Sequence, residues 1–281
     1  MIRLQAQERQ EVTQYIYSIC SIALDHSKDY LIEGRLNPLL DANGCQSFVQ
    51  LIGQARQDRS GALNRRIIDE ITTGETLFFR DSAPFDLLRF KILPELIDRR
   101  ARCGVKAPIR VWSAACSTGQ EVYSLAIVLK ETLGDSNRYD IRVLGTDISD
   151  QAVARASAGH FSALEVGRGL GDAVRARYFN PHSQGWKIRD EIRAMATFQR
   201  LNLMNDFSGL GKFDIVFCRN VAIYFNDKDR ASLFSRIEQR MEKDGCLVIG
   251  SMESLTGVCP QLEPQRHLRS VFYQSASRTS R

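Results

Sequence analysis

The sequence predicts a small all-α domain followed by an α/β domain with a doubly wound sheet. Three observations lead to this prediction. Apolar residues recur at helical spacing over residues 1–75, short apolar runs then alternate with amphipathic helical segments, and residues 108–129 have the pattern of a strand, a tight turn and a helix. Strands that alternate with helices are typical of a mainly parallel sheet covered by helices on both faces.

Charge and hydropathy limit the classes of partner. The net charge is only +5 over 281 residues, no dense Lys/Arg block is present, and no base-stacking aromatic motif lies among basic residues, so a nucleic-acid partner is not expected. No apolar run approaches the roughly 18–20 residues that span a bilayer, so direct membrane insertion is not expected either. The polar N-terminal segment lacks the apolar core of a signal peptide, which favours a cytoplasmic location.

The seven cysteines and four histidines show no metal-ligand spacing. No CxxC pair occurs, and no histidine pairs with an acid or a cysteine in a way that indicates a hydrolase. We therefore expect reduced thiols and no metal site. Cys116 and Cys218 are expected to be small apolar fillers at strand ends rather than nucleophiles.

Four short helices are predicted in the first 75 residues. Their apolar stripes begin at Val12, Tyr30, Phe48 and Leu63, and together such helices form a small bundle. The outer surface of the bundle is expected to be positively charged, because it carries Lys28, Arg35, Arg56, Arg59, Arg65 and Arg66. Two interpretations of this basic face stay open: it binds an acidic partner, or it is simply solvated.

A domain boundary is predicted around residues 75–85. A helix stops near Gly74, two adjacent aromatic residues precede Arg80, and one more helix covers residues 85–103. The first strand of the α/β domain follows at residues 109–112, bounded by a proline.

Seven small residues, 113–119, follow this first strand, and a helix is predicted over residues 118–132. At the carboxyl end of a parallel strand, such a turn is where α/β folds bind their ligands. The unpaired amides at the start of the helix favour polar or anionic ligand groups there. A tight turn without a ligand has a similar pattern, so the turn alone does not decide between the two.

The second strand, residues 141–147, ends in Asp147. In nucleotide-binding α/β units a carboxylate at this place accepts hydrogen bonds from ribose hydroxyls. The alternative is that Asp147 caps the next helix, which begins near Gln151. Because the small-residue turn of the first strand is also present, we favour the ribose role.

The rest of the chain continues the alternation. A loop and a helix are predicted over residues 158–180 and an amphipathic helix over 227–241, and strands are predicted at 186–192, 194–199, 213–220, 246–250 and 271–274. The final residues, 275–281, are polar and are expected to be disordered.

Four blocks of the sequence together resemble the CheR family, the S-adenosylmethionine-dependent methyltransferases of bacterial chemotaxis receptors. The blocks are Thr73-Gly-Glu-Thr-Leu-Phe-Phe-Arg80, Trp112-Ser-Ala-Ala-Cys-Ser-Thr-Gly-Gln-Glu121, Gly145-Thr-Asp147 and Phe213-Asp-Ile-Val-Phe-Cys-Arg-Asn-Val-Ala-Ile-Tyr-Phe225. Two further segments, Lys28-Asp-Tyr-Leu-Ile-Glu-Gly-Arg35 and Gly250-Ser-Met-Glu-Ser254, are also similar to family blocks. The resemblance covers residues 10–273.

This resemblance implies a helical, receptor-facing N-terminal domain at residues 1–78 and a Rossmann-like class I methyltransferase domain at 79–274, with a small β-subdomain near 184–200. It implies S-adenosyl-L-methionine as the cofactor and no metal. The implied reaction converts glutamate side chains of methyl-accepting chemotaxis proteins to methyl esters and releases S-adenosylhomocysteine. The implied partner is the cytoplasmic signalling domain of a chemoreceptor, and the enzyme is expected to be a monomer. A regulatory adaptor protein is left open as a second partner.

By motif position, the resemblance also implies a cofactor pocket and two residues close to the transferred methyl group. The pocket residues are Gly74, Thr76, Arg80, Glu121, Asp147, Asn202, Leu203, Arg219 and Asn220. The residues implied nearest the methyl group are Arg80 and Tyr224. Without the resemblance, Arg80 would be interpreted as a surface ion pair with Asp81 or Asp86, and Tyr224 as a packing aromatic.

Three positions depart from the family pattern. Gly74 stands where the family commonly has Asn, Ala115 where it has Gly, and Gln120-Glu121-Val122-Tyr123 where it has Glu-Glu-Pro-Tyr. Glu121, the acid expected to meet the cofactor, is kept. Gly74 favours one alternative function, a catalytically weak adaptor that binds the cofactor or the receptor.

The turn at residues 180–185 gives a further expectation about the substrate. In members that dock on the C-terminal pentapeptide of a receptor, the corresponding loop is longer and contains Gly-x-Gly. The turn here is short and has no such triplet. The resemblance therefore predicts an enzyme that does not depend on the pentapeptide.

Overall fold

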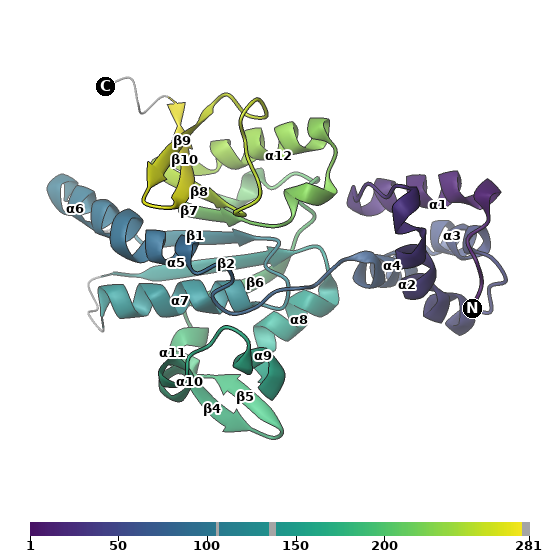
Figure 1. Ribbon diagram of the computed structural model, residues 1–281, viewed down its shortest axis with the longest axis horizontal. Helices are drawn as coiled ribbons and strands as arrows, with labels where there is room; N and C mark the ends of the chain where they lie inside the picture. The colour runs from purple at the N-terminus through teal and green to yellow at the C-terminus, as the bar shows by residue number, and fades with distance from the viewer. Residues whose placement is uncertain (105–106, 135–138, 277–281) are drawn as a thin grey trace.

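The computed structural model describes residues 1–104, 107–134 and 139–276. Figure 1 shows a helical N-terminal bundle beside an α/β domain. The bundle contains the four predicted helices and one short 3-10 turn: α1 (Ala6–Cys20), η1 (His26–Lys28), α2 (Asp29–Ala42), α3 (Phe48–Gln57) and α4 (Ala62–Ile71).

The bundle closes around its own apolar core. Val12, Leu36, Phe48 and Ile67 are buried in one cluster, one from each helix. The stripe of α2 does not begin at Tyr30 as predicted, because the Tyr30 side chain is exposed. Three of the six cations of the predicted basic face contact other groups of the protein. Arg35 donates to the carbonyl of Ile71, Arg56 pairs with Glu11, and Arg65 pairs with Asp150.

The α/β domain is built on a seven-stranded sheet with the order β6-β2-β1-β7-β8-β10-β9. Its strands are β1 (Ile109–Ala114), β2 (Ile141–Asp147), β6 (Ala196–Arg200), β7 (Phe213–Cys218), β8 (Met241–Ile249), β9 (Leu262–His267) and β10 (Ser270–Ser275). The first five strands in this order are parallel, and the hairpin β9–β10 joins β8 in antiparallel fashion. This is the predicted doubly wound sheet.

The register of the sheet brings three strand ends to one edge. Ala114 of β1 pairs with Thr146 of β2 on one side and with Cys218 of β7 on the other. The chain leaves β1 toward β2 and β6, and returns on the opposite side of β1 with β7. Ligands of open α/β sheets bind where the strand order reverses in this way, at the carboxyl ends of the strands.

Successive residues of the central strands enter two separate cores. Val111 and Ile215 lie in the core below α7 (Gln120–Leu133), whereas Trp112 and Val216 lie in the core below α12 (Asp227–Gln239). Figure 1 shows these two helices on opposite faces of the sheet. Because both faces of the sheet are covered by helices, its central strands are mostly apolar, and this apolar character allowed the strands to be predicted from the sequence.

The other helical segments connect the strands or cover the ends of the sheet. They are α5 (Ala83–Leu87), a π turn η2 (Leu88–Ile92), α6 (Leu93–Cys103), α8 (Asp150–Ala158), α9 (Ala163–Gly167), α10 (Asp172–Tyr178), α11 (Asp190–Arg193), η3 (Ser208–Leu210) and η4 (Ala222–Tyr224). The helix predicted over residues 85–103 is thus a continuous run of α5, η2 and α6.

The predicted β-subdomain near 184–200 is wrong in its extent. The second sheet has the order β3-β5-β4, from β3 (His160–Ser162), β4 (Phe179–His182) and β5 (Gly185–Ile188). Residues 196–200 form β6 instead, which pairs with β2 at the edge of the central sheet. The strands β3 and β4 are only three and four residues long and are largely exposed, so they produce no apolar run in the sequence.

Two smaller predictions also need correction. The strand predicted over 186–192 ends at Ile188, and α11 follows with Asp190 and Glu191 in its first turn, where acids favour a helix. The disordered tail was predicted to begin at Ser275, yet Ser275 pairs with Leu262 inside the hairpin β9–β10. Residues 277–281 lie outside the described residues.

Contacts join the bundle to the α/β domain beside the carboxyl edge of the sheet. The Ser149 hydroxyl donates to Asp69 at 2.6 Å, and the amide of Ala23 donates to the carbonyl of Tyr224 at 3.0 Å. The Tyr17 hydroxyl donates to the carboxylate of Asp229. The bundle therefore lies next to the predicted ligand site.

Candidate functional site

The turn after β1 follows a path that favours small residues. Ala115, Ser117 and Gly119 have positive φ angles of 61°, 50° and 93°. A Cβ atom on Gly119 would lie 2.9 Å from the Cβ of Ala156 in α8, so the turn and α8 approach too closely for a larger residue. Ala115, which stands where the family commonly has Gly, accepts a left-handed conformation that costs an L-residue about 1–2 kcal/mol.

Asp147, at the end of β2, accepts hydrogen bonds from the turn after β1 with one carboxylate oxygen and from the segment after β2 with the other. Oδ2 accepts from the amide of Ser117 at 2.8 Å, and Oδ1 accepts from the amide of Ser149 at 3.0 Å. Burial raises the pKa of this carboxyl above its usual range, against the lowering effect of these amides. The N-cap of α8 is Ser149, which accepts from Ala152, so the alternative of Asp147 as the helix cap is wrong.

Each oxygen of Asp147 holds one backbone donor. A carboxylate oxygen can accept two hydrogen bonds, so acceptor capacity for two vicinal hydroxyl groups remains. The arrangement therefore has the chemistry that a ribose requires.

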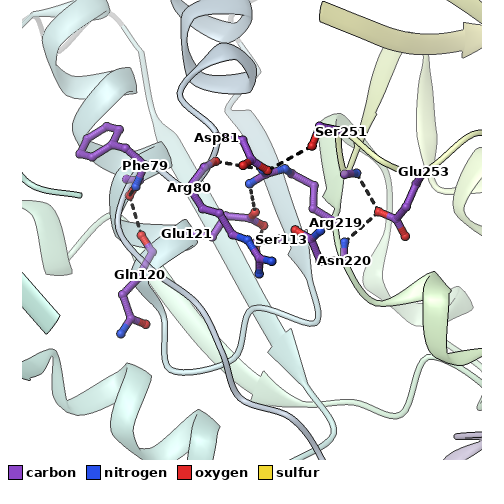
Figure 2. A network of polar contacts seen from close by, with 12 residues as sticks. Phe79, Arg80, Asp81, Ser113, Gln120, Glu121, Arg219, Asn220, Ser251 and Glu253 are labelled. Carbon is purple, nitrogen blue, oxygen red and sulfur yellow. Dashed lines mark hydrogen bonds and ion pairs between the residues drawn. The ribbon is translucent and has the colours of Figure 1, made fainter. Parts of the chain in front are cut away.

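Arg219, the first residue after β7, is the centre of a polar network (Figure 2). Its side chain is only 1% exposed and donates to Glu121 at 3.0 Å, to Asp81 at 2.9 Å and to the carbonyl of Arg80 at 2.9 Å. The other oxygen of Glu121 accepts from the Ser113 hydroxyl at 2.8 Å. Residues 72–82, which connect α4 to α5, form the interdomain segment. A single guanidinium thus links this segment to β1, α7 and β7.

The interdomain segment crosses the site with two non-glycine residues in left-handed conformation, Phe79 and Asp81. The carbonyl of Gly74 accepts from the Ser117 hydroxyl at 2.9 Å, so this segment contacts the turn after β1 through its backbone. A Cβ at position 74 would have ordinary contacts, and the Gly74 departure therefore leaves the path of the chain intact. Thr76 lies half-buried in the same segment.

Arg80 is free to reach a ligand. Its guanidinium donates to the carbonyl of Glu75 at 3.2 Å, and within the described residues neither Asp81 nor Asp86 pairs with it. Asp81 is engaged by Arg219 instead. The interpretation of Arg80 as a surface ion pair with either acid is therefore wrong.

The remaining predicted residues divide between the pocket and its surroundings. Asn220 follows Arg219 in a left-handed conformation, with φ of 58°. Leu203 is buried in the core below α12. Asn202 donates to the carbonyl of Ile19 at 3.3 Å and accepts from Met204, so its side chain serves the contact with α1. Tyr224 is half-buried in η4, where its carbonyl holds the bundle.

Three residues of this network were missed by the sequence analysis. Asp81 and Ser113 hold Arg219 and Glu121, and Glu253 accepts from the amide of Asn220. Glu253 lies inside the block 250–254, which is the one signal that pointed to it.

Neither thiol near the site is activated. Burial raises the pKa of Cys116 and of Cys218 well above the usual value, so both stay protonated and inert. Across residues 1–104, 107–134 and 139–276, no three His, Cys, Asp or Glu side chains gather in a way that would hold a metal ion. In the same ranges, no helix has the length and apolar character to cross a membrane.

Comparison with known proteins adds the family context. The family model described as CheR methyltransferase, all-alpha domain, matches residues 7–72, and the model described as CheR methyltransferase, SAM binding domain, matches residues 74–269. Chemotaxis protein methyltransferase 1 of Pseudomonas aeruginosa is 38% identical over 266 residues, which cover 93% of this chain and 95% of that protein. The chemotaxis protein methyltransferase of Vibrio parahaemolyticus is 34% identical over 276 residues, which cover 97% of this chain and 98% of that protein.

Proposed function

The chain belongs to the CheR family of methyltransferases, and we propose that it methylates glutamate side chains of chemoreceptor signalling domains. The products are glutamate methyl esters and S-adenosylhomocysteine. The observation that carries the proposal is the convergence of Asp147, Glu121 and Arg219 at the strand ends, with the Arg80 guanidinium beside them, paired with no carboxylate of the described residues.

The residues at this edge fit S-adenosylmethionine. Asp147 offers acceptors for the two ribose hydroxyls, and the small residues of the turn let a ligand approach the backbone. Glu121 is a carboxylate near the same edge and suits the ammonium group or the ribose. The first amides of α7 are donors for the methionine carboxylate.

The chemistry needs alignment more than proton transfer. The bound cofactor supplies a methyl group that its positive sulfonium already activates. The acceptor glutamate, with a reference pKa of about 4.3, is ionised at neutral pH and needs no general base. The protein has to hold the carboxylate in line with the methyl group and remove water from it.

A carboxylate that loses its water needs a nearby donor, because otherwise it binds a proton and stops being a nucleophile. Arg80 is the available cation at the site, and it holds either one acceptor oxygen or the carboxylate of the cofactor. The resemblance implies that Tyr224 lies near the transferred methyl group, and we propose that its hydroxyl donates to the acceptor. These roles support transfer to an acidic side chain rather than to a base or an amine.

We also propose that the enzyme acts without a receptor pentapeptide. His182 of β4 pairs directly with Gly185 of β5, so only two residues form the turn of this hairpin. Ser183 takes a left-handed conformation in the turn, as tight hairpins require. Such a short hairpin has no loop that could wrap a peptide added to the edge of the small sheet.

Asp147→Asn is expected to weaken the binding of S-adenosylhomocysteine by about 10–100-fold. An amide has a single acceptor oxygen, so one of the two backbone donors of Ser117 and Ser149 would face an NH2 group, and a ribose hydroxyl would lose its partner. Titration calorimetry of both proteins with S-adenosylhomocysteine measures the change.

The control for this substitution is Asp172→Asn, which makes the same chemical change at an exposed position of α10. It should bind S-adenosylhomocysteine as the parent does. Equal affinity of Asp147→Asn and the parent would remove the ribose role. Failure of the parent itself to bind would favour the adaptor function that Gly74 suggested.

A further inference from the structure

Two loops of the site share a single carboxylate oxygen. Oε2 of Glu253 accepts from the amide of Asn220 at 2.8 Å and from the amide of Gly250 at 2.8 Å (Figure 2). These amides belong to the loops that follow β7 and β8. The other oxygen, Oε1, is buried and has no hydrogen-bond partner among the described residues. Both bonds therefore depend on one oxygen of one side chain.

The space around this oxygen is closely fitted. A Cβ atom on Gly250 would lie 2.4 Å from Oε2 of Glu253, so a side chain at position 250 would displace the carboxylate. The amide of Glu253 donates back to the carbonyl of Gly250 at 2.9 Å, which closes a tight turn around the carboxylate. The loop after β8 is thus shaped to present Glu253 to the loop after β7.

The bond to Asn220 acts at the point where the chain turns toward Tyr224. Asn220 has a left-handed backbone, which is sparsely populated by residues other than glycine and persists when surrounding contacts hold it. Arg219, the residue before Asn220, is held by the hydrogen bonds of its own side chain. The turn η4, which contains Tyr224, begins two residues after Asn220. The direction of the chain at Asn220 therefore contributes to the placement of Tyr224, together with the hydrogen bond from the amide of Ala23 to the Tyr224 carbonyl.

We propose that Glu253 is a positioning residue for methyl transfer, which holds the backbone of Asn220 so that Tyr224 faces the acceptor carboxylate. The proposal rests on the proposed function, because Tyr224 acts on the acceptor only in that reaction. The role needs one acceptor oxygen at one place, and it does not need the negative charge.

This distinction separates Glu253 from Asp147. In Glu253→Gln the side-chain carbonyl oxygen can still accept from both amides, while the NH2 group takes the place of the unpartnered oxygen. Asp147 uses both of its oxygens, so its amide variant cannot keep both bonds. Glutamine at 253 is therefore the conservative variant, and methionine, similar in length but without an acceptor, is the disruptive one.

The test compares the parent, Glu253→Gln and Glu253→Met by two readouts. We expect Glu253→Met to lower kcat with a receptor signalling domain by at least about 10-fold, because small misplacements of reacting groups carry large rate losses. Amide hydrogen exchange over residues 219–225 should become faster in the same variant. Glu253→Gln should keep kcat within about threefold of the parent, and its exchange should match the parent.

Coupling to Tyr224 completes the test. In a Tyr224→Phe background, Glu253→Met should cost little further activity, since the group that it positions is already absent. Additive losses in the double variant would overturn the proposal, and so would a Glu253→Gln variant as slow as Glu253→Met. Unchanged exchange at 219–225 in Glu253→Met would overturn it even if the parent methylates no receptor, so the exchange result is independent of the proposed function.

Discussion

Arg80→Ala is expected to reduce methyl transfer by at least about 100-fold while leaving the fold intact, because it removes the free cation beside the acceptor. Among the described residues this guanidinium donates only to the carbonyl of Glu75, at 3.2 Å, so little stability depends on it. Turnover with labelled cofactor and a receptor signalling domain measures the loss, and chemical denaturation checks the fold.

The same variant decides which carboxylate Arg80 holds. If it holds the acceptor, the affinity for S-adenosylhomocysteine stays at the parent value and only turnover falls. If it holds the carboxylate of the cofactor, calorimetry shows weaker binding as well. The matched control is Arg102→Ala, at an exposed position near the end of α6, which should behave as the parent. Near-normal turnover of Arg80→Ala would remove Arg80 from the reaction.

Arg219→Met is expected to lower the free energy of unfolding by roughly 3–5 kcal/mol, since it removes one partner of a buried ion pair. The Arg219 side chain is 1% exposed and that of Glu121 is 13% exposed, so Glu121 would keep a charge that water screens poorly. Asp81, with its side chain 41% exposed, adds less because solvent screens it. Urea unfolding of the two proteins measures the difference.

A second substitution identifies the cause of this loss. Adding Glu121→Gln to Arg219→Met should recover part of the stability, because it removes the uncompensated charge and keeps an acceptor for the Ser113 hydroxyl. Arg168→Met, at an exposed position, should change stability by less than about 0.5 kcal/mol. An Arg219→Met protein as stable as the Arg168→Met control would show that the network does not hold the site together.

The central sheet could be predicted because its strands are buried on both faces. Residues 109–112, 141–147 and 213–218 are mostly apolar, with one charged residue inside each segment (Arg110, Arg142 and Asp214), and such short segments favour buried strands. The small sheet could not be predicted in the same way. His160 and Ser162 of β3 are exposed, and the pattern of β6 does not indicate which of two sheets it joins.

The site was predicted in part for a similar reason. Asp147 and the turn after β1 are local features, so their order along the chain was enough to place them together. The network around Arg219 depends on the path of the interdomain segment, where Phe79 and Asp81 are left-handed without being glycine. Residue preferences do not predict left-handed conformations at such positions, because tertiary contacts impose them.

Methyl transfer to receptor glutamates can be measured in a single incorporation assay. The parent protein is incubated with methyl-labelled S-adenosylmethionine and a receptor signalling domain, prepared with and without its C-terminal tail. We expect both receptor forms to be labelled at equal rates, and we expect mild base to release the label as methanol, as it does from carboxyl methyl esters. Base-stable label, or no label on a receptor from the same organism, would contradict methyl transfer to receptor glutamates, and label that requires the tail would overturn the pentapeptide-independent docking.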